Sequence, residues 1–458
     1  MEPLKGKNTE MSGSDYVSTK QQRIAELAKQ MPEATLWSLA RYIDIDWLKE
    51  AYRRTRKDGA TGVDDVTAEE YATKLDEHLA SLLERAKSGS YRAPPVKRAH
   101  IPKGDGETRP IGIPTFEDKV LQRAVVMALE PVYEQEFYDC SYGFRPKRSV
   151  HDALASFWDQ AMKMAGGWVL EVDIRKFFDT LDRKHLQTLL RRRVTDGVLL
   201  RLIGKWLNAG VLDDGSLSYP DAGTPQGGVI SPLLANIYLH EVLDKWFALD
   251  VKPRLQGDAF LIRYADDFVI CFARKDDALR VMEVLPRRFG KFGLELHREK
   301  TRLVPFGSPN RSRPDDPPPS TFDFLGFTHF WGKTQKGLWA IKRKTAKGRF
   351  SRALHRIAEW CREHRHDPLQ AQHTSLVRKL RGHYEFYGIT GNADALKRFR
   401  YEVKGIWFHW LSRRSRRRMT FQRFVKLLGR YPLPNSIAFQ SVLRHGYQEP
   451  LRFSKPVT

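Results

Sequence analysis

Two adjacent carboxylates interrupt an apolar stretch in the second half of the chain. Asp266 and Asp267 separate residues 261–265 from residues 268–272, and both flanking segments are rich in apolar side chains. Burying two carboxylates between such strands is costly unless a turn exposes them or a cation neutralises them. The pattern therefore predicts a β-hairpin with an acidic tip.

A second apolar stretch, residues 168–174, carries Asp173 where its apolar run stops. If the two stretches are neighbouring strands of one sheet, Asp173 and Asp266 converge and can hold two hard cations through oxygen ligands. Two Mg²⁺ ions roughly 4 Å apart can activate a 3′-hydroxyl and stabilise a leaving pyrophosphate, which is the chemistry of nucleotide polymerisation. Two adjacent aspartates alone more often mark an ordinary turn, so this interpretation depends on the surrounding motifs.

Helical and strand patterns surround these stretches and predict an α+β fold. The loop at residues 57–63 is Gly-rich, and the loop at residues 308–320 is Pro-rich and reads as a surface loop or hinge. Residues 213–224 read as a third loop. Helices are expected over residues 21–39, 46–54, 71–87 with Thr67 as a cap, 120–130, 184–193, 198–209 and from Ser231, and further strands over residues 96–102, 322–330 and 338–341.

The positive charge is concentrated in the last quarter of the chain. The net charge is +23, yet residues 1–340 carry 51 Lys and Arg against 48 Asp and Glu, whereas residues 341–458 carry 27 against 7. Aromatic residues are interleaved with these cations, so we expect a folded nucleic-acid-binding module in which aromatic rings can also stack on bases. The aromatics are Tyr384, Phe386, Tyr387, Trp407, Phe408, Trp410, Phe421 and Phe424.

Several classes of protein are excluded by composition. Cys140, Cys271 and Cys361 lie far apart without a CxxC pair, which argues against a disulfide framework or a structural zinc site and favours a reducing compartment. The N-terminal segment has no apolar core of a signal peptide, and no window approaches 18 uninterrupted apolar residues. We expect no membrane partner and a cytoplasmic location, in a bacterial cytosol or nucleoid.

The motifs around the aspartates resemble those of the reverse transcriptases, and specifically those of the group II intron reverse transcriptase/maturases. The resemblance covers about residues 57–424, with the motifs in family order and at family spacing. It is carried by Tyr264-Ala-Asp-Asp267 and by residues 109–114 with 119–122, 141–146 with 151–154, 169–173 through 181–182, 223–239, 293–301 and 322–327.

The resemblance implies a right-hand polymerase fold, with fingers, an antiparallel-sheet palm, an α-helical thumb and a helical N-terminal extension. The expected boundaries are a disordered N-terminus over residues 1–20, the extension over 21–90, fingers and palm over 91–340, the thumb or maturase domain X over 341–425, and a short basic DNA-binding segment or tail over 426–458. Many family members end in an HNH endonuclease domain built around paired cysteines. None follows Phe424, so target cleavage by such a domain is not expected.

The same resemblance implies roles for individual residues. Asp173, Asp266, Asp267 and Lys300 would be catalytic, and two Mg²⁺ ions would be held by Asp173, Ile174 and Asp266. Lys300 could stabilise the pyrophosphate as a general acid, or be a solvated lysine at a strand end.

Nucleotide contacts would come from the fingers and palm, and are implied for Lys103, Arg109, Ile174, Phe178, Gln226 and Tyr264. Lys103 and Arg109 lie in or beside a Gly- and Pro-rich turn that suits cations gripping a triphosphate. Phe178 would exclude a 2′-hydroxyl, with a place in the core as the alternative. Gly227 would let bare backbone approach the template. Primer support is implied for Phe324, Leu325 and Gly326, which could instead be core packing.

Five arginines close together would contact RNA or DNA phosphates without reading sequence: Arg413, Arg414, Arg416, Arg417 and Arg418. The resulting hypothesis is an RNA-directed DNA polymerase that binds group II intron RNA, assists its splicing and copies it by target-primed reverse transcription. Its partners would be intron RNA, a DNA target and primer, and dNTPs. The alternatives are a domesticated relative in DNA repair or phage defence, and a non-catalytic maturase. The oligomeric state stays open.

Overall fold

The computed structural model describes residues 13–104, 107–219, 223, 227–310, 317–415 and 418–436. The chain forms two compact units. Unit 1 comprises Met1–Ala153, Val172–Ile270 and Asp276–Arg302, and unit 2 comprises Leu154–Glu171, Cys271–Lys275 and Leu303–Thr458. The mixture of helices with antiparallel strands confirms the predicted α+β class. The functional domain boundaries given above remain predictions.

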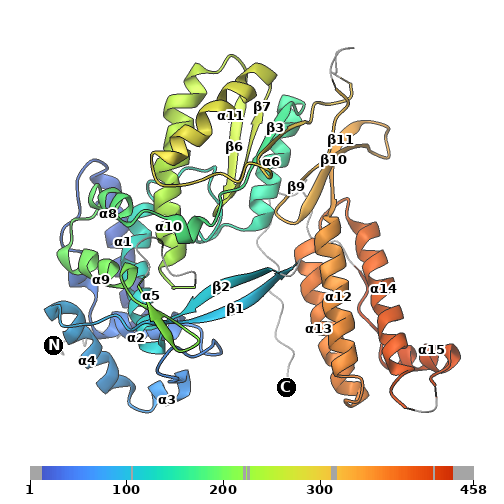
Figure 1. Ribbon diagram of the computed structural model, residues 1–458, viewed down its shortest axis with the longest axis horizontal. Coiled ribbons are helices and arrows are strands. Elements are labelled where there is room, and N and C mark those ends of the chain that lie inside the picture. Colours follow the sequence, from blue (N-terminus) through green and yellow to red (C-terminus); the bar gives the residue numbers. More distant parts are fainter. Residues whose placement is uncertain are drawn as a thin grey trace, which may run out of the picture. The chain divides into compact units, whose positions relative to one another are not determined.

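The N-terminal helices of unit 1 pack on α5 (Phe116–Tyr133), as Figure 1 shows. Trp47 is fully buried, and its indole Nε1 donates a hydrogen bond to the Ala124 carbonyl oxygen of α5 at 3.0 Å. The helices before α5 are α1 (Gly13–Gln30), η1 (Leu39–Tyr42), α2 (Ile45–Arg54), α3 (Ala68–Ala72) and α4 (Leu75–Ser88).

The expectation of disorder through residue 20 is wrong for residues 13–20, which belong to α1. Val17 is completely buried, and Lys20 forms an ion pair with Asp44 at the start of α2. Tertiary contacts of this kind stabilise a helix whose own sequence is polar. The start of the predicted α3–α4 region is confirmed, because Thr67 caps α3 in a capping box with Glu70.

A long antiparallel hairpin follows in unit 1, formed by β1 (Val96–Gly104) and β2 (Glu107–Ile113). It belongs to a sheet of order β2-β1-β4-β5, in which β4 (Val211–Asp213) runs parallel to β1. The strand β5 (Ser216–Ser218) corrects the prediction that residues 213–224 form only a loop. Asp214 and Gly215 adopt positive φ angles of 44° and 85°, the geometry of a tight hairpin turn.

The central sheet has the strand order β6-β7-β3-β8, and β7 and β3 are the two apolar stretches predicted to be neighbours. Its strands are β3 (Trp168–Val172), β6 (Ala259–Tyr264), β7 (Asp267–Phe272) and β8 (Arg302–Pro305). The helix α11 (Lys275–Gly290) packs on β7, where the rings of Phe268 and Phe289 stack at 6.0 Å between centroids. The two apolar stretches are therefore neighbouring strands of one sheet, which is the arrangement on which the expected convergence of Asp173 and Asp266 depends.

Further helices of unit 1 precede the β6–β7 hairpin in the sequence. They are α7 (Phe177–Thr180), α8 (Arg183–Arg191), α9 (Gly197–Leu207) and α10 (Ser231–Leu239). The chain continues from α10 through two π-helical segments, η2 (His240–Asp244) and η3 (Trp246–Val251), and a 3₁₀ turn, η4 (Lys252–Arg254). π-Helical turns are rare and concentrate at functional sites.

Unit 2 contains a sheet of order β11-β10-β9, formed by β9 (Phe322–Phe324), β10 (Phe327–Lys333) and β11 (Trp339–Thr345). Trp158 of α6 (Val150–Met164) donates a hydrogen bond from Nε1 to the Ile341 carbonyl oxygen at 2.9 Å. His329 lies fully buried between the rings of Phe157 and Phe322, and burial lowers its pKa to about 3. The strand pair predicted here is confirmed and gains a third member.

The basic region of unit 2 is helical, as predicted, and Figure 1 shows α12, α13 and α14 side by side. Its elements are α12 (Lys347–Glu363), α13 (Leu369–Tyr387), α14 (Ala393–Leu411) and α15 (Phe421–Arg430). Tyr384, Trp407 and Phe424 are at most 2% exposed because they form the core of these helices. The expectation that these three aromatics could also stack on bases is wrong.

Candidate active site

The tip of the β6–β7 hairpin carries the two adjacent aspartates. Ala265 and Asp266 form the two-residue turn, and Ala265 adopts a φ of 57°, which L-residues rarely occupy. Asp266 is half-buried and Asp267, the first residue of β7, is exposed. The acidic hairpin predicted from the sequence is confirmed, and a positive φ at a non-glycine residue shows that the surroundings impose the turn.

The Asp266 carboxyl lies within electrostatic reach of Asp173 and of two arginines. Burial raises the pKa of Asp266 and the Asp173 carboxylate raises it further, whereas the charges of Arg109 and Arg263 oppose the rise. The structure therefore brings together Asp173 and Asp266 with Arg109 of β2, as the sequence predicted. Two carboxyl groups that repel each other in a half-buried site favour a cation between them.

Asp173 and Lys300 also meet in this site. The Lys300 Nζ lies 3.1 Å from Oδ2 of Asp173, and both side chains are partly exposed at 55% and 39%. The backbone aligns the two segments, because the amide of His297 donates to the Asp173 carbonyl oxygen at 2.8 Å. Lys300 therefore lies beside one of the two carboxylates that are expected to hold metal ions.

The carbonyl of Ile174 adds a third possible oxygen ligand. Ile174 faces Leu296 in an isolated antiparallel bridge. The two hydrogen bonds of that bridge are made by the Asp173 carbonyl and the Arg175 amide, not by the carbonyl of Ile174. Carboxylate and backbone carbonyl oxygens are the ligands that Mg²⁺ prefers. The donor set of Asp173, Asp266 and the Ile174 carbonyl therefore fits Mg²⁺, although no group of three or more His, Cys, Asp or Glu side chains gathers in the described part of the chain.

A fully buried arginine fixes the hairpin from beneath. Arg263 is 0% exposed, and its guanidinium donates from Nε and Nη2 to the two carboxylate oxygens of Asp244 at 2.8 and 2.5 Å. Its Nη1 donates to the Asn236 side-chain oxygen at 2.9 Å and to the Ala265 carbonyl oxygen at 3.0 Å. Because one guanidinium holds both a helix side chain and the turn itself, Arg263 positions the residue that precedes Asp266.

Gly143, which lies between α5 and α6 in the sequence, packs against the same turn. A Cβ atom at Gly143 would lie 2.3 Å from the Ala265 amide nitrogen, so only glycine allows the two backbones to approach. The Asn236 side-chain amide donates to the Gly143 carbonyl oxygen at 2.7 Å and joins this glycine to the Arg263 network. Arg263, Asn236 and Asp244 were missed by the sequence reasoning, although an arginine and an asparagine inside apolar runs were a usable signal.

Phe178, which is expected to exclude a 2′-hydroxyl, lies beside Gly223. Phe178 is half-buried, and its ring packs edge-on against Phe177 at 5.2 Å between centroids. Gly223 has a φ of 85°, and a Cβ atom there would lie 2.7 Å from the carbonyl oxygens of Phe178 and Asp179. The structure thus brings these two motifs together and leaves part of the Phe178 ring accessible.

Gly227 has a packing role that the sequence did not reveal. Its φ is 115°, and a Cβ atom would lie 2.5 Å from the Gly112 carbonyl oxygen of β2. The absence of a side chain is therefore needed for contact with the β1–β2 hairpin. Tyr264 is half-buried, with a pKa raised by burial, and its ring lies 6.4 Å from that of Phe144.

Other predicted site residues are placed elsewhere or lie outside the described residues. The Lys103 side chain, Gln226, Arg416 and Arg417 are not among the described residues. In unit 2, Phe324 is 5% exposed, and Leu325 and Gly326 form a turn of positive φ that packs near the Tyr387 hydroxyl. Arg413 and Arg418 are exposed, and Arg414 donates a hydrogen bond to the His366 carbonyl oxygen at 3.2 Å.

Comparison with known proteins identifies the class. Residues 101–329 match the family described as reverse transcriptase (RNA-dependent DNA polymerase). Protein YkfC of Escherichia coli K12 is 34% identical over 327 residues, which cover 63% of this chain and 84% of YkfC. The group II intron-encoded protein LtrA of Lactococcus lactis is 38% identical over 245 residues, which cover 52% of this chain and 39% of LtrA.

A yeast protein, the putative COX1/OXI3 intron 1 protein of Saccharomyces cerevisiae, is 26% identical over 311 residues, which cover 57% of this chain and 37% of that protein. The chain thus spans less than two fifths of the length of the LtrA and yeast relatives. The chain belongs to the reverse transcriptase family, and within it to the group II intron reverse transcriptase/maturases. The predicted family and enzyme class are confirmed.

None of the helices in the described ranges combines the length and the apolar composition needed to cross a lipid bilayer.

Proposed function

We propose that this chain catalyses RNA-directed DNA synthesis at a site formed by Asp173, Asp266 and Asp267. The observation that carries the proposal is the pairing of Asp173 and Asp266 at neighbouring strand ends, where burial raises the pKa of Asp266 and the Asp173 carboxylate adds to the rise. Two Mg²⁺ ions held there with the Ile174 carbonyl would activate the 3′-hydroxyl of the primer and stabilise the leaving pyrophosphate.

The residues of the chain would orient the reactants around these ions. Arg109 carries a cation on the finger hairpin within electrostatic reach of Asp266, which suits it to hold a dNTP triphosphate. Lys300, which pairs with Asp173, would stabilise negative charge on the departing phosphates and could protonate them. The accessible part of the Phe178 ring would pack against the sugar and exclude a 2′-hydroxyl.

We further propose that the nucleic-acid partners are group II intron RNA and a DNA target with its primer. The relative LtrA is named as a group II intron-encoded protein, and the basic helical region supplies exposed cations, including Arg413 and Arg418, for phosphate contacts. Assistance to splicing and target-primed copying of the intron would follow from binding the same RNA.

Primer extension on an RNA template with a DNA primer, dNTPs and Mg²⁺ tests the chemistry. Replacing Asp266→Ala plus Asp267→Ala should lower the extension rate by at least about a hundredfold, because the charge that balances the metal ions is removed. RNA affinity, measured by fluorescence anisotropy, should change by less than about twofold.

The matched control is Asp64→Ala plus Asp65→Ala, another adjacent pair of acidic residues, both exposed. It should extend the primer at the rate of the unmodified protein. Equal extension by the Asp266/Asp267 variant and the control would contradict the assignment of the metal site.

A further inference from the structure

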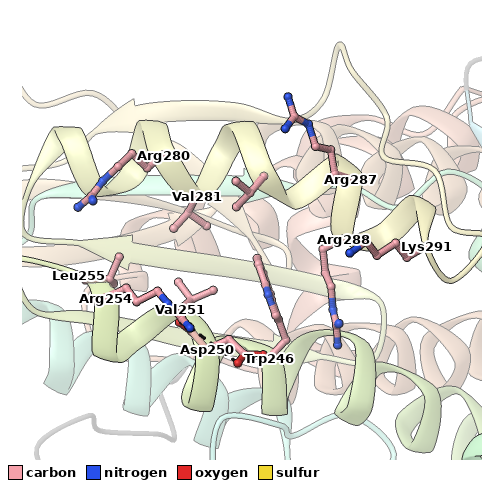
Figure 2. A pocket seen from close by; sticks show the side chains of 11 residues that line it. Trp246, Asp250, Val251, Arg254, Leu255, Arg280, Val281, Arg287, Arg288 and Lys291 are labelled. Atoms are coloured by element: carbon pink, nitrogen blue, oxygen red, sulfur yellow. Dashed lines mark hydrogen bonds and ion pairs between the residues drawn. The ribbon is translucent and has the colours of Figure 1, made fainter.

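A groove of about 540 Å³ lies in unit 1 between α11 and the π-helical segment η3. Figure 2 shows Val281, Val251, Trp246 and Arg288 between these two elements, whereas the Arg287 side chain points away from η3. None of its lining residues belongs to the candidate active site. They are Trp246, Asp250, Val251, Arg254, Leu255, Arg280, Val281, Val284, Arg287, Arg288 and Lys291. We call this feature the α11 groove.

The floor of the α11 groove is apolar. Val251 and Val281 are buried at 8% and 3% exposure, and Leu255 and Trp246 are half-buried beside them. Val284 lies on the same helix one turn after Val281 and is 41% exposed. An exposed valine next to a partly covered apolar floor is a surface that gains free energy when another apolar side chain covers it.

The lining carries five cations and a single carboxylate. The Arg254 and Arg287 side chains are 73% and 78% exposed, and their nearest carboxylates, Asp250 and Glu283, lie at 3.9 Å. Ion pairs that are this long and exposed contribute little stability. Arg254 also donates from Nη1 to the Asp250 carbonyl oxygen, and its other nitrogens and the Arg287 guanidinium are placed to bind an anion from outside.

Arg288 is held in place by the π-helical turns. Its Nε donates to the Val242 carbonyl oxygen and its Nη2 to the Glu241 carbonyl oxygen, both at 2.9 Å. Its guanidinium also lies 5.8 Å from the centre of the Trp246 ring. The unusual backbone of η2 and η3 thus fixes one cation and one aromatic ring of the groove.

We propose that the α11 groove binds an acidic, apolar peptide segment of a partner protein. Apolar side chains of such a segment would cover the valines of the floor, and its carboxylates would meet the arginines, which bind carboxylates in bidentate fashion. From Arg280 to Lys291 the groove follows roughly 16 Å of helix axis. About five residues in extended conformation match that length.

A peptide fits this surface better than single-stranded RNA does. An RNA base placed on the aliphatic floor would bury polar edges without hydrogen-bond partners, which is costly. The sole aromatic ring of the lining, Trp246, is already faced by Arg288. The last 22 residues of the chain, residues 437–458, carry three Lys and Arg against one Glu. Their net charge is positive, like that of the groove, so they do not supply the acidic segment.

Fluorescence anisotropy with the full chain at about 150 mM salt tests the proposal, because long-range attraction to residues 341–458 is then largely screened. The probe is a fluorescein-labelled ten-residue peptide with three alternate leucines among glutamates. Replacing Arg287→Gln plus Lys291→Gln should weaken its binding about tenfold, since two ion pairs are removed. The matched control, Lys184→Gln plus Arg191→Gln, removes the same charge from exposed positions on α8.

Two further arms separate the groove from general charge attraction. A peptide with serine in place of each leucine should bind at least about tenfold more weakly, because its side chains no longer cover the apolar floor. A labelled ten-nucleotide RNA should bind the groove variant and the control variant equally. The proposal is overturned if both variants lose peptide affinity equally, if the serine peptide binds as tightly as the leucine peptide, or if the groove variant alone loses RNA affinity. Thermal unfolding of both variants should match that of the unmodified chain.

Discussion

At the scale of single residues, Asp118 shows how a buried carboxyl can make stability depend on pH. It is 2% exposed and accepts hydrogen bonds from Tyr91, from the Trp206 indole and from Gln122. Gln122 in turn accepts a hydrogen bond from the amide of Ile230, just before α10. Burial raises the pKa of Asp118 to about 6.

This raised pKa has a definite sign for stability. The folded chain holds the Asp118 proton more tightly than the unfolded chain does, so its contribution to stability is full below the ordinary carboxyl pKa and is lost as the pH rises to about 6. We expect Asp118→Asn to remove a decline of roughly 2–3 kcal/mol between pH 4 and pH 6.

Urea unfolding across this pH range measures the difference between the two proteins. The exposed Asp76→Asn serves as the control, because the exposed carboxyl of Asp76 should give no comparable change. A variant that keeps the full pH dependence of the unmodified chain would show that Asp118 titrates normally.

The placement of the two proposed metal-binding aspartates was predictable, whereas the residues that hold them in place were not. Asp173 and Asp266 stand at the ends of apolar runs, which is a local pattern visible in sequence. The partners of Arg263 are 19 and 27 residues away along the chain. Contacts at such separations depend on tertiary packing, which local periodicity does not encode.

At the scale of elements, the β6–β7 hairpin depends on a buried ion pair with the π-helical segment η2. Arg263 and Asp244 are both essentially unexposed. Burial opposes their charges, but their mutual attraction lowers the pKa of Asp244 and raises the pKa of Arg263, so both stay charged. Removing one partner of a buried pair leaves the other charge uncompensated in the interior. Replacing both by apolar residues of similar size avoids that penalty.

We therefore expect Asp244→Leu alone to lower the free energy of unfolding by about 3–5 kcal/mol. The double variant Arg263→Met plus Asp244→Leu should be more stable than Asp244→Leu, because no charge is left unpaired. Urea unfolding of Asp244→Leu, of Arg263→Met and of the double variant measures this coupling. Strictly additive losses would show that the two residues do not act as a pair.

Elements with strong apolar patterns were predicted well, and elements defined by long-range contacts were not. The β6–β7 hairpin, α10 and the helices of the basic region follow apolar periodicity that is evident in the sequence. The strand β5 has three exposed residues and no such pattern, since it exists by pairing with β4. The first turns of α1 likewise depend on contacts with α2 and α5.

At the scale of the whole molecule, the charge is divided between chemistry and binding. Residues 1–340 are nearly neutral, with 51 Lys and Arg against 48 Asp and Glu, while residues 341–458 carry 27 Lys and Arg against 7 Asp and Glu. Tyr384, Trp407 and Phe424 form the core of that region, so we expect its exposed cations to make most of the proposed contacts with nucleic acid. Binding through phosphates releases counterions and is weakened by salt.

Replacing the exposed or half-exposed Arg413, Arg414 and Arg418 by Gln should therefore weaken single-stranded RNA binding and flatten its salt dependence. Removing one ion pair with a phosphate changes the slope of log affinity against log salt by about 0.7, so removing three should change it by about two. Anisotropy titrations between about 50 and 200 mM salt measure this slope. The matched control replaces the exposed cations Lys184, Arg191 and Lys252 by Gln. If the two triple variants show the same slope, the arginine cluster does not bind the RNA directly, and the surplus charge of the region acts only at a distance.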